Sequence, residues 1–307
     1  MIYINIKGGI GNQCFQYALG RAIQLNGYDV RYDIRSFQSY RHSFRLGCFN
    51  TKLELATEID LEAIDKIISS CKIYTVPFMG RKNLFLKLMK FLWIIYDRLT
   101  YVYRPVIKDH SLQDIRILSP KGQKYYDGYW SKPYFFDKIS HLLRTELRLQ
   151  EEHFNEDFIK VKRKIVTSKV PYVAIHIRRG DYIDAVNSKI FYSLGSDYYK
   201  SAISYFNNRF DQIRFIFFSN DIAWCKQHFY GHFEFLDEIE LSDFHEFELI
   251  KLCKHQIIAN STYSWWAAWL NENPEKIVIA PKTWYSNPKL QARYENGMLI
   301  PESWIKL

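Results

Sequence analysis

The first 34 residues show the hydrophobic pattern of a β-loop-α-β unit. Residues 2–6 alternate apolar and polar side chains, which predicts a strand, and the glycine loop Gly8-Gly9-Ile10-Gly11 follows directly. Apolar residues then recur at helical spacing over 15–23, and Gly27 predicts the end of that helix. Residues 28–34 predict a second strand. Parallel sheets are built from units of this kind.

A regular alternation of short apolar runs and helix-like stretches begins near residue 170. The apolar runs predict strands at 172–177, 213–218, 256–259 and 277–280. The stretches between them predict helices at about 197–208, 221–229, 243–255 and 264–272. Strands that alternate with helices indicate a second parallel α/β domain. The charged stretch 150–168 contains the predicted boundary, which divides the chain into domains 1–155 and 156–307.

The part of the chain between these two patterns is less regular. It contains helix candidates at 58–70 and 137–149 and a strongly apolar stretch at 84–96. Basic residues flank and interrupt that stretch, so 81–98 suits contact with a membrane surface, contact with a lipid-linked ligand, or a core helix of the first domain.

Polar or glycine-rich segments follow the predicted strands, at the ends where open parallel sheets bind their ligands. These segments are Gly8–Asn12, His176–Asp181, Ser219–Asp221 with Asn220 at its centre, Asn260–Thr262 and Pro281–Lys282.

The segment after residue 175 has the chemistry of a phosphate site. Strand alternation sends His176 and Arg178 to one face, and Arg179 and Asp181 follow where the strand opens into a loop. The guanidinium fork matches the oxygens of a phosphate, although a surface Arg-Asp pair would show the same spacing. Ser261 and Thr262 open a helix, which favours either an anion site or an ordinary N-cap.

Composition and charge narrow the classes of partner. Hydrophobic residues make up 48% of the chain and charged residues 24%, which excludes disordered and fibrous classes. The aromatic content of 17% suits stacking on sugars or bases, or simply an aromatic core. The formal net charge of +9 favours phosphorylated or other polyanionic partners. Nucleic acid is disfavoured, because the basic residues form no single tract interleaved with aromatics.

The cysteines and the start of the chain predict a cytoplasmic protein. Five cysteines without a C-x-x-C pair argue against a disulfide framework. Met1 leads directly into the first strand, and no apolar run approaches the roughly 20 residues that span a bilayer. We therefore expect at most peripheral contact with the inner membrane face, through 81–98.

The sequence offers no ligand set typical of a metal site. No Asp-x-Asp pair occurs, and the histidines lack the spacing of a helical zinc motif, so we expect no metal ion. A partial dinucleotide fingerprint is present, since Gly9 and Gly11 precede Asp33 by about 20 residues, but Cys14 holds the third glycine position. The fingerprint makes an NAD-dependent oxidoreductase one candidate function, and the aromatic content with the positive charge makes a non-catalytic glycan-binding protein another.

Six blocks of sequence, in order along nearly the whole chain, resemble the alpha-1,2-fucosyltransferases of glycosyltransferase family 11. They are GGIGNQCFQYALGRAI (8–23), GYWSKPYFF (128–136), HIRRGDY (176–182), FFSNDIAWCKQHF (217–229), LCKHQIIANSTYSWWAAWLN (252–271) and IAPKTWY (279–285).

The resemblance implies a GT-B architecture, in which two Rossmann-like α/β domains face each other across a cleft. The first domain would be the acceptor side and the second would bind GDP-fucose, with the last residues packing back on the first. The implied reaction is an inverting, metal-independent transfer of fucose to the 2-hydroxyl of a terminal galactoside. The acceptor itself is not indicated, and residues 35–150 should determine it.

The resemblance also implies roles for individual residues. Arg178 would stabilise the departing GDP, His176 would line the nucleotide site, and Arg179 and Asn220 would contribute to donor binding. Ser261 and Thr262 would bind phosphate oxygens, and Asn12 would reach the fucose or the diphosphate from the first domain. Asp181 would be either the catalytic base or the residue that orients Arg179.

One position departs from the family pattern. The family usually has Asp nine residues before the histidine of the C-K-H block, where a carboxylate pairs with guanine, and this chain has Glu246 there. The extra methylene leaves Asp243 and Glu248 as alternative carboxylates for guanine.

Overall fold

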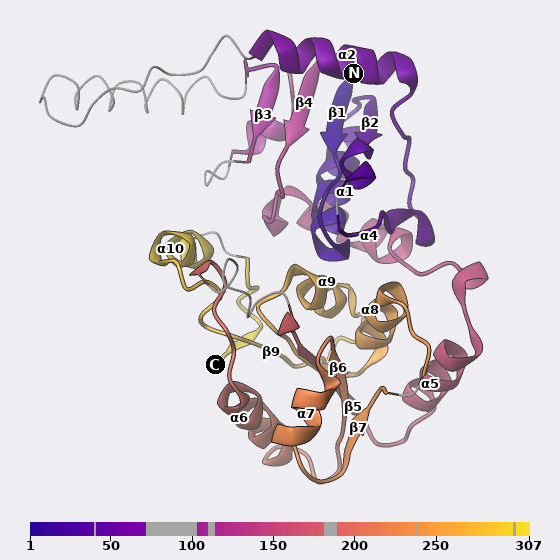
Figure 1. Cartoon of the computed structure of the whole chain (residues 1–307), viewed down its shortest axis with the longest axis vertical. Helices are drawn as coiled ribbons and strands as arrows, with labels where there is room; N and C mark the ends of the chain where they lie inside the picture. Colours follow the sequence, from indigo (N-terminus) through magenta and orange to yellow (C-terminus); the bar gives the residue numbers. More distant parts are fainter. Residues whose placement is uncertain (40, 72–102, 110–113, 181–188, 238, 297–298) are drawn as a thin grey trace, which may run out of the picture.

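The computed structural model describes residues 1–39, 41–71, 103–109, 114–180, 189–237, 239–296 and 299–307 (Figure 1). The apolar stretch 84–96 and Asp181 lie outside these ranges. The described residues form two parallel sheets, one in the upper and one in the lower half of Figure 1. None of the helices in these ranges has both the length and the apolar character needed to cross a bilayer.

The first sheet has the strand order β2-β1-β4-β3, with every pair parallel. Its strands are β1 (Ile2–Asn5), β2 (Val30–Asp33), β3 (Val106–Lys108) and β4 (Lys124–Asp127). Helix α1 (Ile10–Leu25) joins β1 to β2, as the sequence pattern predicts. Helix α2 (Glu58–Cys71) covers one face of the sheet, where Ile64 packs with Tyr3 and Tyr125.

The second sheet has the order β10-β9-β8-β5-β6-β7 and is also fully parallel. Its strands are β5 (Tyr172–Ile177), β6 (Arg214–Ser219), β7 (Phe233–Phe235), β8 (His255–Ile257), β9 (Val278–Ala280) and β10 (Ile305–Lys306). In chain order this is 6-5-4-1-2-3, the doubly wound arrangement, and the order reverses between β5 and β8. A ligand crevice is therefore expected beyond the ends of these two strands.

Helices surround the second sheet. They are α5 (Glu156–Val166), α6 (Ser196–Asn207), α7 (Ile222–His228), α8 (Asp243–Leu252), α9 (Thr262–Leu270) and α10 (Pro288–Asn296). Because both faces of the sheet are covered, β5 is buried along its whole length. Val173, Ile175 and Ile177 pack into one hydrophobic cluster, whereas Tyr172 and Ala174 face the cluster that the two sheets share.

An aromatic core joins the two halves of the molecule. Helix α1 of the first half contacts α9 of the second, which Figure 1 shows at the top of the lower half. The ring of Phe15 lies 5.0 Å from Trp265 and 5.0 Å from Trp266, and Phe136 stacks 5.1 Å from Trp266. Such ring pairs each contribute about 0.5–1.5 kcal/mol beyond their buried area. The S-W-W motif therefore fixes one sheet against the other.

Several elements differ from the sequence expectations. Helix α8 ends at Leu252 rather than at 255, because the chain is extended again in β8 from His255. The predicted helix at 137–149 is a 3-10 turn, Asp137–Ile139, followed by the short helix α4 (Ser140–Glu146). The charged stretch 150–168 contains α5, whose Phe158, Val161 and Ile165 are buried.

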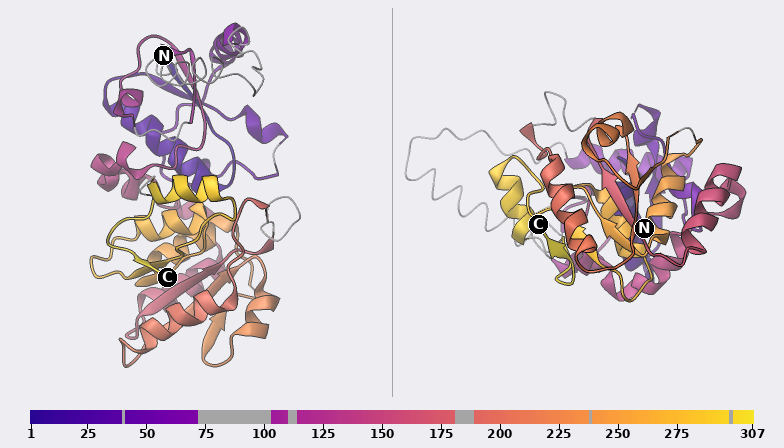
Figure 2. Two further views of the ribbon diagram at one scale, coloured as in Figure 1. Left: turned by 90° about the vertical axis from the view of Figure 1, so that its left-hand side faces the viewer. Right: turned by 90° about the horizontal axis from the view of Figure 1, so that it is seen from below.

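The last residues of the chain form an edge strand. Strand β10 pairs with β9 at the edge of the second sheet, and Trp304 just before it lies 5.8 Å from Trp265 in the core that both halves share, so the expected packing on the first domain stays a prediction. Figure 2 shows the two halves stacked along the long axis, with the carboxyl terminus beside the lower one.

Candidate functional site

A cavity of about 650 Å³ lies between the two halves, at the ends of their central strands. Its size is within the range of ligand pockets. The first half contributes Gly9, Ile10, Gly11, Asn12, Arg41, His42, Tyr129 and Ser131. The second half contributes His176, Arg178, Phe191, Ser219, Asn220, Asp243, Glu246, Ser261, Thr262, Tyr263, Trp284, Tyr285 and Leu290. Most of the predicted site residues therefore come together in one place.

His176 enters the cavity wall from the end of β5. Its side chain is 5% exposed, and its ring lies 5.2 Å from that of Tyr263. Burial, together with the neighbouring Arg178, lowers the pKa of His176 to about 3. The imidazole is therefore neutral at physiological pH and offers one donor and one acceptor. Its buried Nδ1 has no hydrogen-bond partner among the described residues.

The two consecutive arginines after β5 differ in position. Arg178 lines the cavity, whereas Arg179 is absent from the lining residues. The Arg179 guanidinium lies 4.2 Å from the ring centroid of Trp224, and its Nε is 3.3 Å from Oδ2 of Asp221. A role of Arg179 in supporting the loop fits this position, and its direct contact with a donor stays a prediction.

Asn220 lines the cavity and also supports the turn after β5. Its Oδ1 accepts a hydrogen bond of 3.0 Å from the backbone N–H of Arg179. A Cβ atom on Gly180 would lie 2.3 Å from Nδ2 of Asn220, so a larger residue here would displace the Asn220 amide. Asp181 comes next in the chain, and its predicted roles are untested because it lies outside the described residues.

Two helix N-termini, those of α1 and α9, meet at the cavity. Ser261 is the N-cap of α9, where its Oγ accepts from the N–H of Tyr263 at 3.3 Å. Thr262 Oγ1 donates to Asn12 Oδ1 at 3.1 Å and so connects the two halves. Neither helix has an acidic residue in its first turn. The positive ends of both helix dipoles therefore favour an anion here.

Close backbone contact makes this junction possible. A Cβ atom on Gly11 would lie 2.3 Å from the carbonyl carbon of Thr262 and 2.5 Å from the backbone nitrogen of Tyr263. Gly11 therefore lets α1 touch the start of α9. Gly11, the second glycine of the partial dinucleotide fingerprint, thus serves the contact between the two halves.

The sequence offers three candidate carboxylates for binding guanine, and two of them, Asp243 and Glu246, line the cavity. Burial and, secondarily, the charge of Asp243 raise the pKa of Glu246 to about 7. Asp243 also pairs with Arg45, whose Nε lies 3.0 Å from Oδ1. Glu248 instead places its Oε2 2.6 Å from Nζ of Lys251, on the other side of α8.

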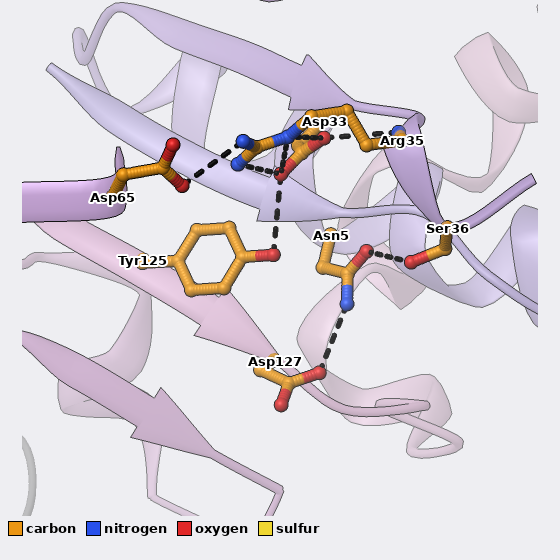
Figure 3. Close-up of polar contacts among 7 residues, drawn as sticks. All are labelled: Asn5, Asp33, Arg35, Ser36, Asp65, Tyr125 and Asp127. Carbon is orange, nitrogen blue, oxygen red and sulfur yellow. Dashed lines mark hydrogen bonds and ion pairs between the residues drawn. The ribbon is translucent and has the colours of Figure 1, made fainter. Parts of the chain in front are cut away.

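Asp33, the acidic residue of the dinucleotide alternative, is engaged within the first half. It is 3% exposed, and its Oδ2 accepts from Nη2 of Arg35 at 2.9 Å and from the hydroxyl of Tyr125 at 3.3 Å. Figure 3 shows these contacts beside a second group in which Asn5 joins Ser36 to Asp127. Asp33 is thus committed to internal contacts, which weakens the NAD interpretation.

Two residues of the site come from a strained loop that the sequence analysis did not single out. Tyr129 and Ser131 line the cavity on either side of Trp130, which has a φ of 56°. This conformation costs a non-glycine residue roughly 1–2 kcal/mol. The only sequence signal was the block at 128–136. No sequence pattern indicates that Arg41 and His42 line the cavity. Their loop is held by Gln13, which hydrogen-bonds to the backbone of Ser43 and Arg45, and this long-range contact is not visible in the local sequence.

The described residues contain no group of three or more His, Cys, Asp or Glu side chains arranged to hold a metal ion. The described histidines make contacts of other kinds. His245 contacts the backbone carbonyl of His153, and His255 accepts a hydrogen bond from the backbone N–H of Ile277. The cavity-lining residues that carry a fixed positive charge are Arg41 from the first half and Arg178 from the second, and the two helix N-termini add partial positive charge.

The sequence profile of glycosyl transferase family 11 matches residues 1–306. The chain belongs to this family. Within family 11, the chain is 30% identical to the O-antigen biosynthesis glycosyltransferase WbnK of Escherichia coli over 324 residues, covering 100% of both chains. It is 27% identical to an alpha-1,2-colitosyltransferase of Escherichia coli, covering 100% of this chain and 99% of the other. It is also 30% identical to the galactoside alpha-(1,2)-fucosyltransferase 2 of Hylobates lar, over 57% of this chain and 53% of that one.

A solved structure supports the fold of this family 11 chain. The crystal structure of the fucosyltransferase NodZ from Bradyrhizobium matches with a TM-score of 0.50 and 10% sequence identity, covering 87% of this chain and 91% of the other. Two parallel, Rossmann-like α/β sheets with the cavity between them confirm the predicted GT-B architecture. The domain boundary at 155–156 stays a prediction.

Proposed function

We propose that this chain transfers L-fucose from GDP-L-fucose to the 2-hydroxyl of a terminal galactoside, with inversion at the anomeric carbon. The observation that carries the proposal is the position of Arg178 and the N-termini of α1 and α9 around one cavity between the two halves. A nucleoside diphosphate is the leaving group that such a set of donors would stabilise. Family membership supports glycosyl transfer as the reaction.

The proposed mechanism is a single displacement. The acceptor oxygen attacks the anomeric carbon from the face opposite the diphosphate, the bond to the β-phosphate oxygen breaks, and GDP departs with its electron pair. Arg178, Ser261 and Thr262 would bind the phosphate oxygens, and Asn12 would contact the fucose or the diphosphate from the first half. Asp181 stays a candidate for the base that takes the acceptor's proton.

Neutral His176 would serve the donor as a hydrogen-bonding group rather than as a charge. Because its pKa is lowered to about 3, it stays uncharged across the range in which such enzymes work. Its Nδ1 would find a partner in the bound nucleotide. Asn220 would lie beside it at the end of β6.

Colitosyl transfer is a second candidate, favoured by the full-length relative with an alpha-1,2-colitosyltransferase name. Colitose is L-fucose without its 3-hydroxyl, so both sugars carry the same methyl group and the same ring. An enzyme that hydrogen-bonds the 3-hydroxyl rejects the deoxy sugar strongly, whereas one that does not bond it accepts both. Whether the enzyme hydrogen-bonds the 3-hydroxyl of the donor sugar therefore determines which donor it prefers.

The test is a transfer assay with each donor. Purified protein is incubated with GDP-L-fucose or GDP-colitose and a panel of β-galactosides in the presence of EDTA, and the product linkage and anomer are determined by NMR. The proposal expects an α-1,2-fucosyl product, and kcat/KM higher for GDP-L-fucose than for GDP-colitose. The reverse ratio supports colitosyl transfer, and no product from either donor contradicts both candidates.

We propose that Glu246 is the carboxylate that pairs with guanine, and this role predicts that nucleotide binding depends on pH. A carboxylate accepts hydrogen bonds from the N1 and N2 hydrogens of guanine, so GDP binds the ionised form. Because the pKa of Glu246 is raised to about 7, the ionised fraction falls as the pH falls below 7. The dissociation constant of GDP should rise roughly tenfold for each pH unit below that value.

Calorimetric titration of GDP between pH 5.5 and 8.5 measures this dependence. The variant Glu246→Gln should bind GDP more weakly at pH 8 and show a smaller dependence on pH, because only the terminal phosphate of GDP, with a pKa of about 6, then titrates in this range. An exposed carboxylate away from the cavity, Glu272, supplies the control variant Glu272→Gln. If wild-type affinity is the same at pH 6 and pH 8, Glu246 does not bind the base as an anion.

A further inference from the structure

The sequence block at 128–136 has no role in the donor site, yet it forms part of the cavity wall. Nearly all residues assigned to the donor belong to the second half, after β5, β6 and β8. In the first sheet β1 and β4 are neighbours at the centre, and the loops after both reach the cavity. The loop after β1 supplies Gly9 and leads into the first turn of α1, which supplies Asn12, while the loop after β4 supplies Tyr129 and Ser131. The second substrate of a transfer reaction would enter opposite the donor, at this wall.

Tyr129 has the properties of a sugar-binding platform. Tyr129 lines the cavity and is 42% exposed, so its ring is accessible to a ligand. A pyranose ring has an apolar face of C–H groups that packs on an aromatic ring, while its hydroxyls stay at the edge.

A charged pair lies next to this ring. Nζ of Lys7 is 5.5 Å from the centroid of Tyr129 and 2.5 Å from Oδ1 of Asp127. Both side chains of the pair are partly exposed, at 24% and 29%. Lys7 and Asn5 lower the pKa of Asp127 despite its burial, so the carboxylate is ionised at neutral pH. The pair does not line the cavity itself, and it offers both donors and an acceptor to sugar hydroxyls that extend past the ring of Tyr129.

The loop that carries Tyr129 is held firmly in place. Asp109 accepts a hydrogen bond from the backbone N–H of Trp130 at 3.0 Å and one from Nζ of Lys132 at 2.8 Å. A Cβ atom on Gly128 would lie 2.4 Å from Cβ of Asp109, so only glycine permits this approach. The left-handed backbone of Trp130 is therefore fixed by Asp109, and strain of this kind concentrates at ligand sites.

We propose that Tyr129 binds the apolar face of the acceptor's terminal pyranose, that the Lys7–Asp127 pair hydrogen-bonds its hydroxyls, and that Asp109 is the positioning residue of this subsite. The inference rests on the proposed function, since it assigns the acceptor of that same transfer to the first half. It identifies the acceptor as a pyranoside with one face free of hydroxyls near the ring, as in a β-galactoside.

The experiment separates acceptor binding from donor binding. The variants Tyr129→Ala, Tyr129→Phe and Asp109→Asn are compared with wild type for the KM of methyl β-galactoside and the dissociation constant of GDP. The control is Tyr230→Ala, because Tyr230 is 81% exposed and does not line the cavity. Saturation-transfer NMR of the galactoside with GDP present measures acceptor binding without turnover.

The alanine variant should raise the acceptor KM about fivefold to tenfold, the value of one aromatic contact, with the GDP dissociation constant unchanged. The phenylalanine variant keeps the stacking face and should stay close to wild type. Asp109→Asn should raise the acceptor KM with little change in kcat, whereas a general loss of folding would lower kcat and GDP affinity together.

The two proposals fail in different ways. An acceptor KM and an NMR signal that Tyr129→Ala leaves unchanged, in a protein that binds GDP, overturn the acceptor subsite alone. Wild-type protein that binds GDP but no pyranoside at all also overturns it. Wild-type protein that binds no GDP overturns the proposed function, and the NMR titration then still decides whether Tyr129 binds a sugar.

Discussion

Replacing Arg178 by alanine should lower kcat/KM roughly a thousandfold, the upper range for removal of one group that stabilises developing charge. Arg178 lines the cavity beside the N-termini of α1 and α9, where the charge of a leaving diphosphate would develop. The guanidinium fork binds two phosphate oxygens at once, which no other side chain does with fixed charge. Arg178→Lys should therefore recover only part of the activity.

Steady-state kinetics with thermal unfolding of each variant measure this effect. The melting temperature of Arg178→Ala should stay near that of wild type, because Arg178 is partly exposed at the cavity. The matched control is Arg148→Ala, which removes an exposed arginine paired with Glu272 and should leave kcat/KM unaffected. An Arg178→Ala enzyme with near-normal turnover would refute the assigned role.

Replacing Gly11 by alanine should also abolish most of the activity, by pushing the two halves apart. The added Cβ would lie 2.3 Å from the backbone of Thr262, and backbone atoms cannot turn away as a flexible side chain can. The displacement would break the hydrogen bond between Thr262 and Asn12 and misplace both helix N-termini. A misplacement of about 1 Å costs on the order of a hundredfold in kcat/KM.

Overpacking of this kind also lowers the free energy of unfolding by about 1–3 kcal/mol. Chemical denaturation and kinetics of Gly11→Ala measure the two effects separately. Gly47→Ala is the control in the same half, because its Cβ would meet only Phe44 at 3.6 Å, an ordinary contact. If Gly11→Ala kept wild-type activity, the contact between α1 and α9 would have no part in forming the site.

The sequence predicts the fold well where each element is long or its pattern is local. The unit β1-α1-β2 and the strands β5, β6, β8 and β9 were visible because apolar residues recur at the spacing of their own secondary structure, whereas β7 was not predicted. Strand β4 was missed because a lysine occupies one of its buried positions. The buried Lys124 looks polar, yet its Nζ donates to the backbone carbonyls of Tyr103 and Arg104.

Part of the candidate site also followed from local geometry. Strand alternation placed His176 and Arg178 on one side, and both line the cavity. Helix geometry would have separated the carboxylates of α8: residues 243 and 246 share a face, while 248 lies about 200° around the helix from 246. The structure shows this division, since Glu248 pairs with Lys251 away from the cavity.

The rest of the site depends on contacts between distant segments. Nothing local indicates that α9 packs on α1, because the aromatic run of α9 only predicts a buried helix. The roles of Tyr129 and Asp109 depend on the left-handed conformation of Trp130, which no side-chain pattern predicts for a tryptophan. Contacts of this kind follow from the assembled fold, so the acceptor side was the part that the sequence could not specify.

A crystal structure of the protein with bound GDP tests the central claim most directly. The account predicts a diphosphate between the Arg178 side chain and the backbone of Ser261 and Thr262, with guanine against the carboxylate of Glu246. A nucleotide bound away from Arg178, for example with its ribose at Asp33, would contradict it.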